Sequence, residues 1–174
     1  MKARLLCNYS KPTANEVKDY LVTHFERAHP PDILISYLHP KVVSKKVLSQ
    51  TKLWNINFHP GPPEYPGIGC YNFALKDDVK TYGVTAHIME PKVDTGKIIK
   101  VKRFDVLPTD TVYSLSIKSY GHMYVMFLEL MDYILKWGEV PYSSEEWKRP
   151  AYTRKELNEL CDASEPDDRW VKYP

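Results

Sequence analysis

One stretch of this chain limits its fold more than any other. Residues 32–37, D-I-L-I-S-Y, form a continuous apolar run of strand length. Such a run is typical of a central parallel strand, which helices cover on both faces. Residues 17–25 before it carry apolar side chains at helical spacing, after Thr13 and Glu16, which are spaced as a capping box. We expect that helix to stop at the prolines of residues 30–31.

The remaining chain continues the alternation of strands and helices. Further strands are predicted at residues 3–7, 53–59, 82–90 and 97–106, and further helices at residues 40–50 and from 109 or 110 to Gly138. The polar tail holds two more pairs with capping-box spacing, Ser143 with Glu146 and Thr153 with Glu156. This order predicts an α/β fold with a mostly parallel sheet flanked by helices, followed by a helical tail. We assign residues 1–140 to one domain and residues 141–174 to a tail that packs on it or extends from it.

Composition excludes several classes of function. The 174 residues, 43% of them hydrophobic, suit one compact domain. A net charge of +2 gives no field that would attract nucleic acid or an anionic membrane. No apolar run approaches the ~20 residues that a membrane helix needs, and the first residues are too short an apolar stretch for a signal peptide. The odd number of cysteines, three and far apart, fits neither a disulfide framework nor a zinc motif. We expect a cytoplasmic protein with no metal, nucleic-acid or membrane partner.

The candidate site lies in the middle third of the chain. Five of the seven glycines fall between residues 61 and 96, and glycine serves special backbone angles and close ligand approach. Asn57 and His59 lie just before this region, on one face at the C-terminal end of a predicted parallel strand, where open α/β sheets bind ligands. An amide and an imidazole can stabilise a carbonyl oxygen that gains negative charge and can move a proton. The N-x-H spacing alone equally fits two residues that cap a strand.

A second candidate is Asp94, in the turn D-T-G between two predicted strands. Aspartate two residues before glycine is common in ordinary turns. His87, in the preceding strand, is either a partner of the site or a plain strand histidine. The D-T-G motif also occurs in retropepsin-type aspartic proteases, but Lys92 interrupts the apolar strand that they need and Lys97 replaces their small residue after glycine.

Three segments, in order, resemble the formyltransferase family that uses 10-formyltetrahydrofolate. Residues 32–40, D-I-L-I-S-Y-L-H-P, resemble the strand and loop beside the folate pocket. Residues 55–67, N-I-N-F-H-P-G-P-P-E-Y-P-G, resemble the motif N-x-H-P-S-L-L-P-x-x-x-G. Residues 83–99, G-V-T-A-H-I-M-E-P-K-V-D-T-G-K-I-I, resemble the motif G-x-T-x-H-x-x-x-x-x-x-D-x-G-x-I-I. The resemblance implies a shortened Rossmann-like formyltransferase domain with 10-formyltetrahydrofolate as formyl donor.

The same resemblance assigns residues to roles. Asn57, His59 and Asp94 match the catalytic asparagine, histidine and aspartate, and His87 matches a histidine on the same strand in many members. The folate pocket is expected to include Ser36, Tyr37, Leu38, His39 and Val93. The chain departs from the family pattern at Gly61, where serine is usual, and its part before Asn57 is shorter than usual.

The acceptor is the least constrained feature. The form H-P-G-P-P-E-Y-P-G-I-G and the tail sequence R-K-E-L look most like sugar-nucleotide N-formyltransferases, which implies an amino-dideoxy sugar nucleotide as acceptor. Tyr9, Glu64, Tyr65 and Tyr71 are candidate acceptor contacts, with simple loop packing as the equal alternative. Two other functions stay open: a formyltransferase with another small amine acceptor, and an inactive shortened member that only binds folate or a nucleotide. A Tyr- and Met-rich helix surface near residues 113–124 makes a homodimer possible.

Overall fold

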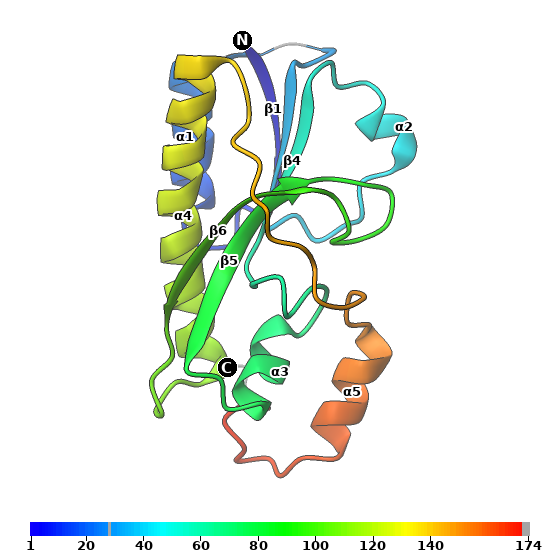
Figure 1. Cartoon of the computed structure of the whole chain (residues 1–174), viewed down its shortest axis with the longest axis vertical. Coiled ribbons are helices and arrows are strands. Elements are labelled where there is room, and N and C mark those ends of the chain that lie inside the picture. Colours follow the sequence, from blue (N-terminus) through cyan, green and yellow to red (C-terminus); the bar gives the residue numbers. More distant parts are fainter. Residues whose placement is uncertain (28, 172–174) are drawn as a thin grey trace.

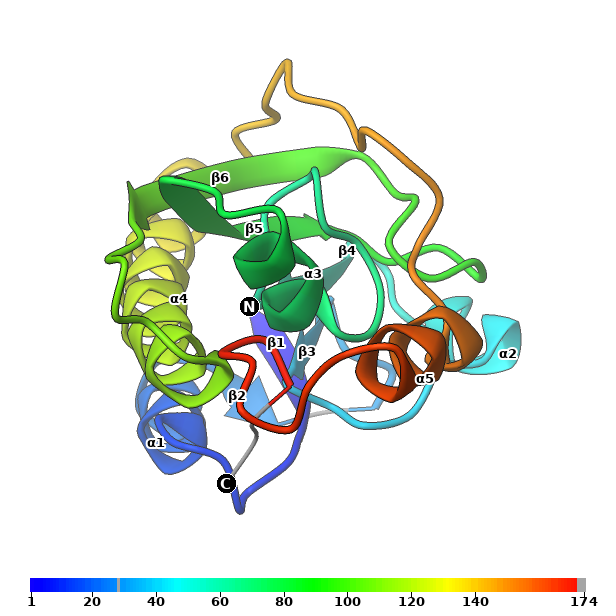
Figure 2. The same ribbon diagram turned by 90° about the horizontal axis from the view of Figure 1, so that it is seen from below.

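A six-stranded sheet forms the centre of the molecule, and the computed structural model describes residues 1–27 and 29–171 (Figure 1, Figure 2). The strand order is β2-β1-β3-β4-β5-β6. The strands are β1 (Lys2–Cys7), β2 (Glu26–Arg27), β3 (Ile33–Tyr37), β4 (Trp54–His59), β5 (Thr81–Ile88) and β6 (Ile98–Asp105). The first four pair in parallel, whereas β5 and β6 add an antiparallel hairpin to β4. The predicted α/β fold with a mostly parallel sheet is confirmed.

The apolar run at residues 32–37 contains β3, which lies between β1 and β4 in the sheet. All five of its residues are buried, as expected for a parallel strand covered on both faces. The strand that carries Asn57 and His59 is its neighbour β4. Because β4 pairs in parallel with β3 and antiparallel with β5, it lies where the sheet changes direction.

Two helices cover one face of the sheet: α1 (Ala14–His24) and the long α4 (Val112–Trp137) (Figure 2). Their apolar sides form the main core with the central strands. Thr111 caps α4 through a capping box with Ser114, and Gly138 ends it with left-handed backbone angles. The predicted C-terminal end is therefore confirmed. The predicted cap at residue 109 or 110 is wrong by two positions or one, because the Asp110 carboxylate binds Leu107, Ser114 and Lys118 instead.

Three predicted helix features are wrong. The helix α2 spans only Lys45–Leu48, because residues 40–43 form part of a cleft wall and Ser44 is the first residue able to cap it. The first helix ends at His24, before its predicted proline stop, because the chain turns into β2. Thr13 precedes that helix but does not cap it through its side chain. Its hydroxyl lies 2.8 Å from the hydroxyl of Tyr37 instead.

The tail contains one helix, α5, and continues in turns to residue 171. Helix α3 (Cys70–Lys76) and helix α5 (Arg154–Asp162) lie at the end of the molecule away from α2 (Figure 1). The Thr153–Glu156 capping box is confirmed at the start of α5. The Ser143–Glu146 pair starts no helix, because residues 141–150 run extended instead. The division into two parts at residue 140 stays a prediction.

The surface of the described residues carries two further findings. None of the described helices is long and apolar enough to cross a membrane. Helix α4 exposes Tyr113, Ile117 and Val125, the surface on which the expected homodimer depends, and this association stays a prediction.

Candidate active site

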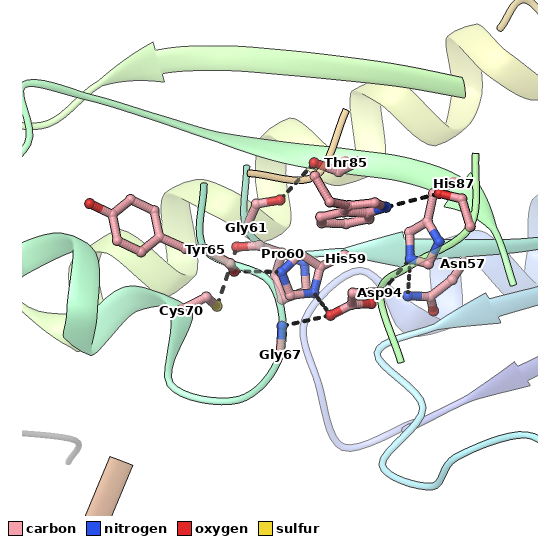
Figure 3. A network of polar contacts seen from close by, with 12 residues as sticks. Asn57, His59, Pro60, Gly61, Tyr65, Gly67, Cys70, Thr85, His87 and Asp94 are labelled. Carbon is pink, nitrogen blue, oxygen red and sulfur yellow. Dashed lines mark hydrogen bonds and ion pairs between the residues drawn. The ribbon is translucent and has the colours of Figure 1, made fainter. Parts of the chain in front are cut away.

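The site begins with a pair of residues on adjacent strands. In the antiparallel pairing of β4 with β5, Asn57 lies opposite His87 and His59 lies opposite Thr85. The Asn57 amide nitrogen lies 3.1 Å from Nε2 of His87. The register of β4 and β5 therefore places the side chains of Asn57 and His87 next to each other (Figure 3).

Asp94 completes the cluster from the loop between β5 and β6. Its left-handed backbone, with φ of 47°, is one that aspartate tolerates better than most residues. One carboxylate oxygen lies 3.4 Å from Nδ1 of His59, and the other lies 3.2 Å from Nε2 of His87. The Gly67 backbone N–H donates to the same carboxylate at 2.7 Å. The amide, two imidazoles and the carboxylate thus converge, and only 6% of Asp94 is exposed.

The charge of Asp94 is fixed by its neighbours. Burial by itself would raise the pKa of this carboxyl group. His59, the hydrogen bond and charge of His87 and the Gly67 N–H together outweigh burial, and they hold the pKa of Asp94 well below its ordinary value. The site therefore keeps a carboxylate next to two histidines at any pH at which the protein works.

The hydrogen-bond partners of His59 determine where its protons lie. Nε2 is 3.0 Å from the carbonyl oxygen of Tyr65. A carbonyl oxygen only accepts, so Nε2 donates to it. The other ring nitrogen, Nδ1, faces the Asp94 carboxylate.

In His87 it is Nδ1, and not Nε2, that lies against a backbone carbonyl oxygen. Its Nδ1 donates to the Ile88 carbonyl oxygen at 2.8 Å, so Nε2 is the nitrogen that faces the cluster. Nε2 lies 3.1 Å from the Asn57 amide nitrogen and 3.2 Å from the Asp94 carboxylate.

Two glycines leave room for these contacts. A Cβ at Gly61 would lie 2.6 Å from Nε2 of His59 and 2.9 Å from the Tyr65 carbonyl oxygen, so any side chain there would displace the ring from its bond. Gly67 has a φ of +87°, and a Cβ would lie 2.4 Å from the Tyr152 carbonyl oxygen. That close approach brings its N–H to Asp94.

A cleft of about 510 Å³ opens against this cluster. Asn57, His59, His87 and Asp94 line it together with Ser36, Leu38, His39, Val93 and others. Four of the five predicted folate contacts therefore lie in the cleft wall. Tyr37 does not, because its side chain is fully buried in the core beside α1.

The four predicted acceptor contacts do not line this cleft, as far as the described residues go. Glu64 forms an ion pair with Arg103 at the surface. Tyr65 and Tyr71 are buried in the aromatic cluster around α3, and Tyr9 is 53% exposed on the loop after β1. Glu64, Tyr65 and Tyr71 follow His59 closely in the sequence, but their side chains do not line the cleft.

Sequence reasoning missed part of the cleft wall. Met89 and Ile68 supply apolar surface, and Ala151, Tyr152 and Thr153 reach the cleft from the tail. Met89 follows β5 directly, so its place could have been inferred from the strand. The tail residues carried no signal, because their position depends on a distant backbone pairing between Gly67 and Tyr152. In the described residues, no group of three His, Cys, Asp or Glu side chains could hold a metal ion.

A comparison with protein families identifies the family to which the chain belongs. The family model described as formyl transferase matches residues 3–124, well over half of the chain. The chain belongs to the formyl transferase family. The matched residues include Asn57, His59, His87 and Asp94, whereas the tail lies outside the match.

Three curated relatives are similar to the chain, and the names of two of them contain different acceptors. The chain is 36% identical over 98 residues to the bifunctional polymyxin resistance protein ArnA of Wigglesworthia glossinidia brevipalpis, covering 55% of this chain and 15% of that protein. It is 29% identical over 129 residues to methionyl-tRNA formyltransferase of Thermotoga maritima, covering 74% and 41%. It is 27% identical over 128 residues to GDP-perosamine N-formyltransferase of Brucella melitensis biotype 1, covering 73% and 48%. The chain spans less than half the length of these curated relatives.

Two solved structures share the fold of the chain at low sequence identity. PseJ from Anoxybacillus kamchatkensis, solved with UDP-4,6-dideoxy-4-formamido-L-AltNAc and tetrahydrofolate, has a TM-score of 0.76 at 18% identity, covering 98% of this chain and 94% of that chain. HypX from Aquifex aeolicus, solved with tetrahydrofolic acid, has a TM-score of 0.71 at 17% identity, covering 98% and 32%. The Rossmann-like formyltransferase fold predicted from the sequence is confirmed.

Proposed function

We propose that this chain transfers the formyl group of 10-formyltetrahydrofolate to the amino group of an amino-dideoxy sugar nucleotide. The observation that carries the proposal is the convergence of Asn57, His59 and Asp94 at the end of one cleft. The three come from two separate segments of the chain, and a structural role alone does not require them to meet. Membership of the formyl transferase family supports the reaction class.

The cleft fits a reduced folate as formyl donor. Leu38, Met89 and Val93 give it apolar surface beside the polar cluster. His39 lines it too, and Nδ1 of His39 is buried without a hydrogen-bond partner among the described residues. A buried polar atom of this kind costs free energy until a ligand satisfies it. These residues would hold the folate ring, and the donor would supply the formyl carbon.

The residues of the cluster divide the chemistry between them. As an amine adds to a formyl carbon, the formyl oxygen gains negative charge. The Asn57 amide has a second N–H beyond the one directed at His87, and this N–H is free to donate to that oxygen. The positive charge that His59 carries when Nδ1 is protonated stabilises the same oxygen from a short distance.

The proton of the attacking amine needs an acceptor. Nδ1 of His59 would take it, since Nε2 is held on the Tyr65 carbonyl oxygen, and Nδ1 lies 3.4 Å from the Asp94 carboxylate. Asp94 stabilises the ring when it holds this proton and keeps it oriented when it does not. The pair would then return the proton to the folate nitrogen as the bond between that nitrogen and the formyl carbon breaks. We assign proton transfer to the His59–Asp94 pair and stabilisation of the oxygen chiefly to Asn57.

Similarity to sugar N-formyltransferases favours the acceptor class. GDP-perosamine N-formyltransferase and PseJ are similar to this chain over most of its length, and their names or ligands contain nucleotide-linked amino sugars. PseJ is also matched over 94% of its own chain, so a domain of this size suffices in that protein.

The test is a transfer assay with 10-formyltetrahydrofolate and a panel of amines: amino-dideoxy sugars linked to UDP, GDP and dTDP, glycinamide ribonucleotide, and simple amino sugars without a nucleotide. We expect tetrahydrofolate release coupled to formamide formation with at least one nucleotide-linked amino sugar. Transfer to another amine would overturn the acceptor class and keep the reaction. Tight folate binding without transfer to any member of the panel would favour the inactive binding protein.

A further inference from the structure

Residues 141–150, hereafter the strap, join α4 to the segment before α5 and run extended across the molecule (Figure 1). Burial alternates along the strap: the odd-numbered residues are partly buried and the even-numbered ones are exposed. Backbone bonds hold it at two points. The Ser143 N–H donates to the Ile98 carbonyl oxygen, and the Lys148 N–H donates to the Pro63 carbonyl oxygen, each at 3.0 Å.

Side chains and a second backbone pairing reinforce this path. Glu145 forms an ion pair with Arg103 of β6. Just beyond the strap, Tyr152 exchanges backbone hydrogen bonds with Pro66 and Ile68 at 2.9 and 3.1 Å. The strap is thus fixed to β6 at one end and to the loop after His59 at the other, and its middle must cross between them.

The middle of the strap places the side chain of Trp147 against His59 and His87. The Trp147 indole N–H donates to the Gly96 carbonyl oxygen at 2.8 Å. Its ring lies 5.0 Å from the ring of His87 at an interplanar angle of 88°, and 5.9 Å from that of His59 at 69°. Both are edge-to-face contacts of the favourable kind. Trp147 does not line the cleft, so it backs the histidines while the cleft lies on their other side.

We propose that Trp147 is a positioning residue: the strap seals the back of the active site with this indole and holds both imidazoles against Asp94. The proposal rests on the proposed function for its kinetic consequence. His59 and His87 are only 5% and 2% exposed, and their attraction to Asp94 is strong because water is kept away from them. Without the indole, water would enter the space behind the rings, and the rings would be free to turn.

The Gly96 contact adds a second route of action. Asp94 and Gly96 belong to the same turn, and Gly96 packs against the Ile88 backbone so closely that a Cβ would lie 1.9 Å from the Ile88 oxygen. The indole N–H ties this turn to the strap. Trp147 therefore contacts the rings of His59 and His87 directly, and it is linked to Asp94 through the turn that contains Gly96.

The kinetic test uses four variants: Trp147→Ala, Trp147→Leu, Trp147→Phe and the control Trp137→Ala. Trp137 is 60% exposed at the end of α4, so it is matched in residue type but remote from the site. We expect Trp147→Ala to lower kcat about 10- to 100-fold, as for a small misplacement of catalytic groups, with the KM of both substrates changed less than about threefold. Trp147→Leu, which keeps apolar volume without a flat ring, should lower kcat about 10-fold. Trp147→Phe, which keeps a flat ring but loses the bond to Gly96, should lower kcat less than Trp147→Leu does, and the control should stay near wild type.

A spectroscopic test is independent of the proposed function. In protein labelled with ¹⁵N-histidine, sealed imidazole N–H protons exchange slowly and give observable signals. We expect these signals in wild type, Trp147→Phe and the control, and their loss by exchange in Trp147→Ala and Trp147→Leu. If no acceptor is ever found, this measurement still decides whether Trp147 shields the histidines.

Two results would overturn the inference. One is wild-type kcat and protected imidazole signals in folded Trp147→Ala, or in Trp147→Leu if the alanine variant does not fold. The other is an equal loss of kcat in Trp147→Phe and Trp147→Leu, which would mean that the indole hydrogen bond alone matters and the ring does not position the histidines.

Discussion

Replacing Asp94 with asparagine removes one negative charge from the site and little else. Asparagine has nearly the same shape and is among the residues that best tolerate the left-handed backbone found at this position. Its carbonyl oxygen can still accept from the Gly67 N–H. Its NH₂ group would then face Nε2 of His87, where a carboxylate oxygen now lies at 3.2 Å. Alanine would add backbone strain and a cavity, so asparagine is the cleaner test.

The size of the effect follows from the contacts that are lost. The charged partner of His59 at 3.4 Å and that of His87 at 3.2 Å both disappear. A hydrogen bond to a charged group contributes about 1.5–3 kcal/mol. If the transition state depends on one such interaction with a protonated His59, turnover should fall at least ~100-fold, since ~2.7 kcal/mol corresponds to that factor.

The assay is the steady-state rate of formyl transfer, with the KM of the donor measured alongside. We expect kcat to fall and the donor KM to change little, because Asp94 is proposed to act on the reaction and not on folate binding. Turnover of Asp94→Asn within about threefold of wild type would refute the role of Asp94, whatever the fold of the variant.

The same variant makes a prediction about acid stability. The pKa of Asp94 is lower in the folded chain than the value of about 3.9 expected in the unfolded chain. The unfolded chain therefore binds this proton first as the pH falls, so the stabilisation is complete above about pH 4 and is lost progressively below it. We expect the difference in Tm between wild type and Asp94→Asn to be larger at pH 7 than at pH 3. An equal difference at both pH values would contradict the lowered pKa.

Three further changes test separate parts of the account. Gly61→Ala should lower turnover without unfolding the protein, because the new methyl group would lie 2.6 Å from Nε2 of His59; circular dichroism and kcat together check this. Glu64→Gln should leave the KM of both substrates unchanged and cost less than about 1 kcal/mol of stability, because an exposed ion pair with Arg103 is all that it loses; acceptor titrations that show a raised KM would restore Glu64 as an acceptor contact. Thr153→Ala should cost about 1 kcal/mol in denaturant unfolding, because it removes a capping box; an unchanged midpoint would show that α5 does not depend on its cap.

The parts of the fold that could be predicted are those that local patterns determine. The buried run that became β3 carries its own strand signal, and the stop at Gly138 follows from a left-handed C-cap. The single-turn α2 could not be predicted, because residues 40–43, which were expected to form its first turn, line a cleft instead. The extended path of residues 141–150 was also hidden, since its backbone partners lie 40 or more residues away.

The site, like the fold, has some features that local sequence patterns determine and others that depend on distant contacts. Asn57 and His59 share a face because strand geometry demands it, and their position at a strand end was visible in the sequence. Asp94 was placed by its motif. Its contacts with both histidines depend on the β5–β6 loop folding back, which no local pattern reveals. The acceptor contacts stay a prediction. Nearness in sequence to His59 says nothing about the direction in which a loop side chain points, as the buried Tyr71 illustrates.

The central claim is that Asn57 and Asp94, which lie far apart in the sequence, serve one reacting carbon. The most direct test is the kcat of formyl transfer for Asn57→Ala, Asp94→Asn and the double variant. Residues that act as a unit give strongly non-additive losses, so the double variant should be about as slow as the slower single variant. Losses that multiply in the double variant would mean that the two residues act separately, and the account of a single convergent site would be wrong.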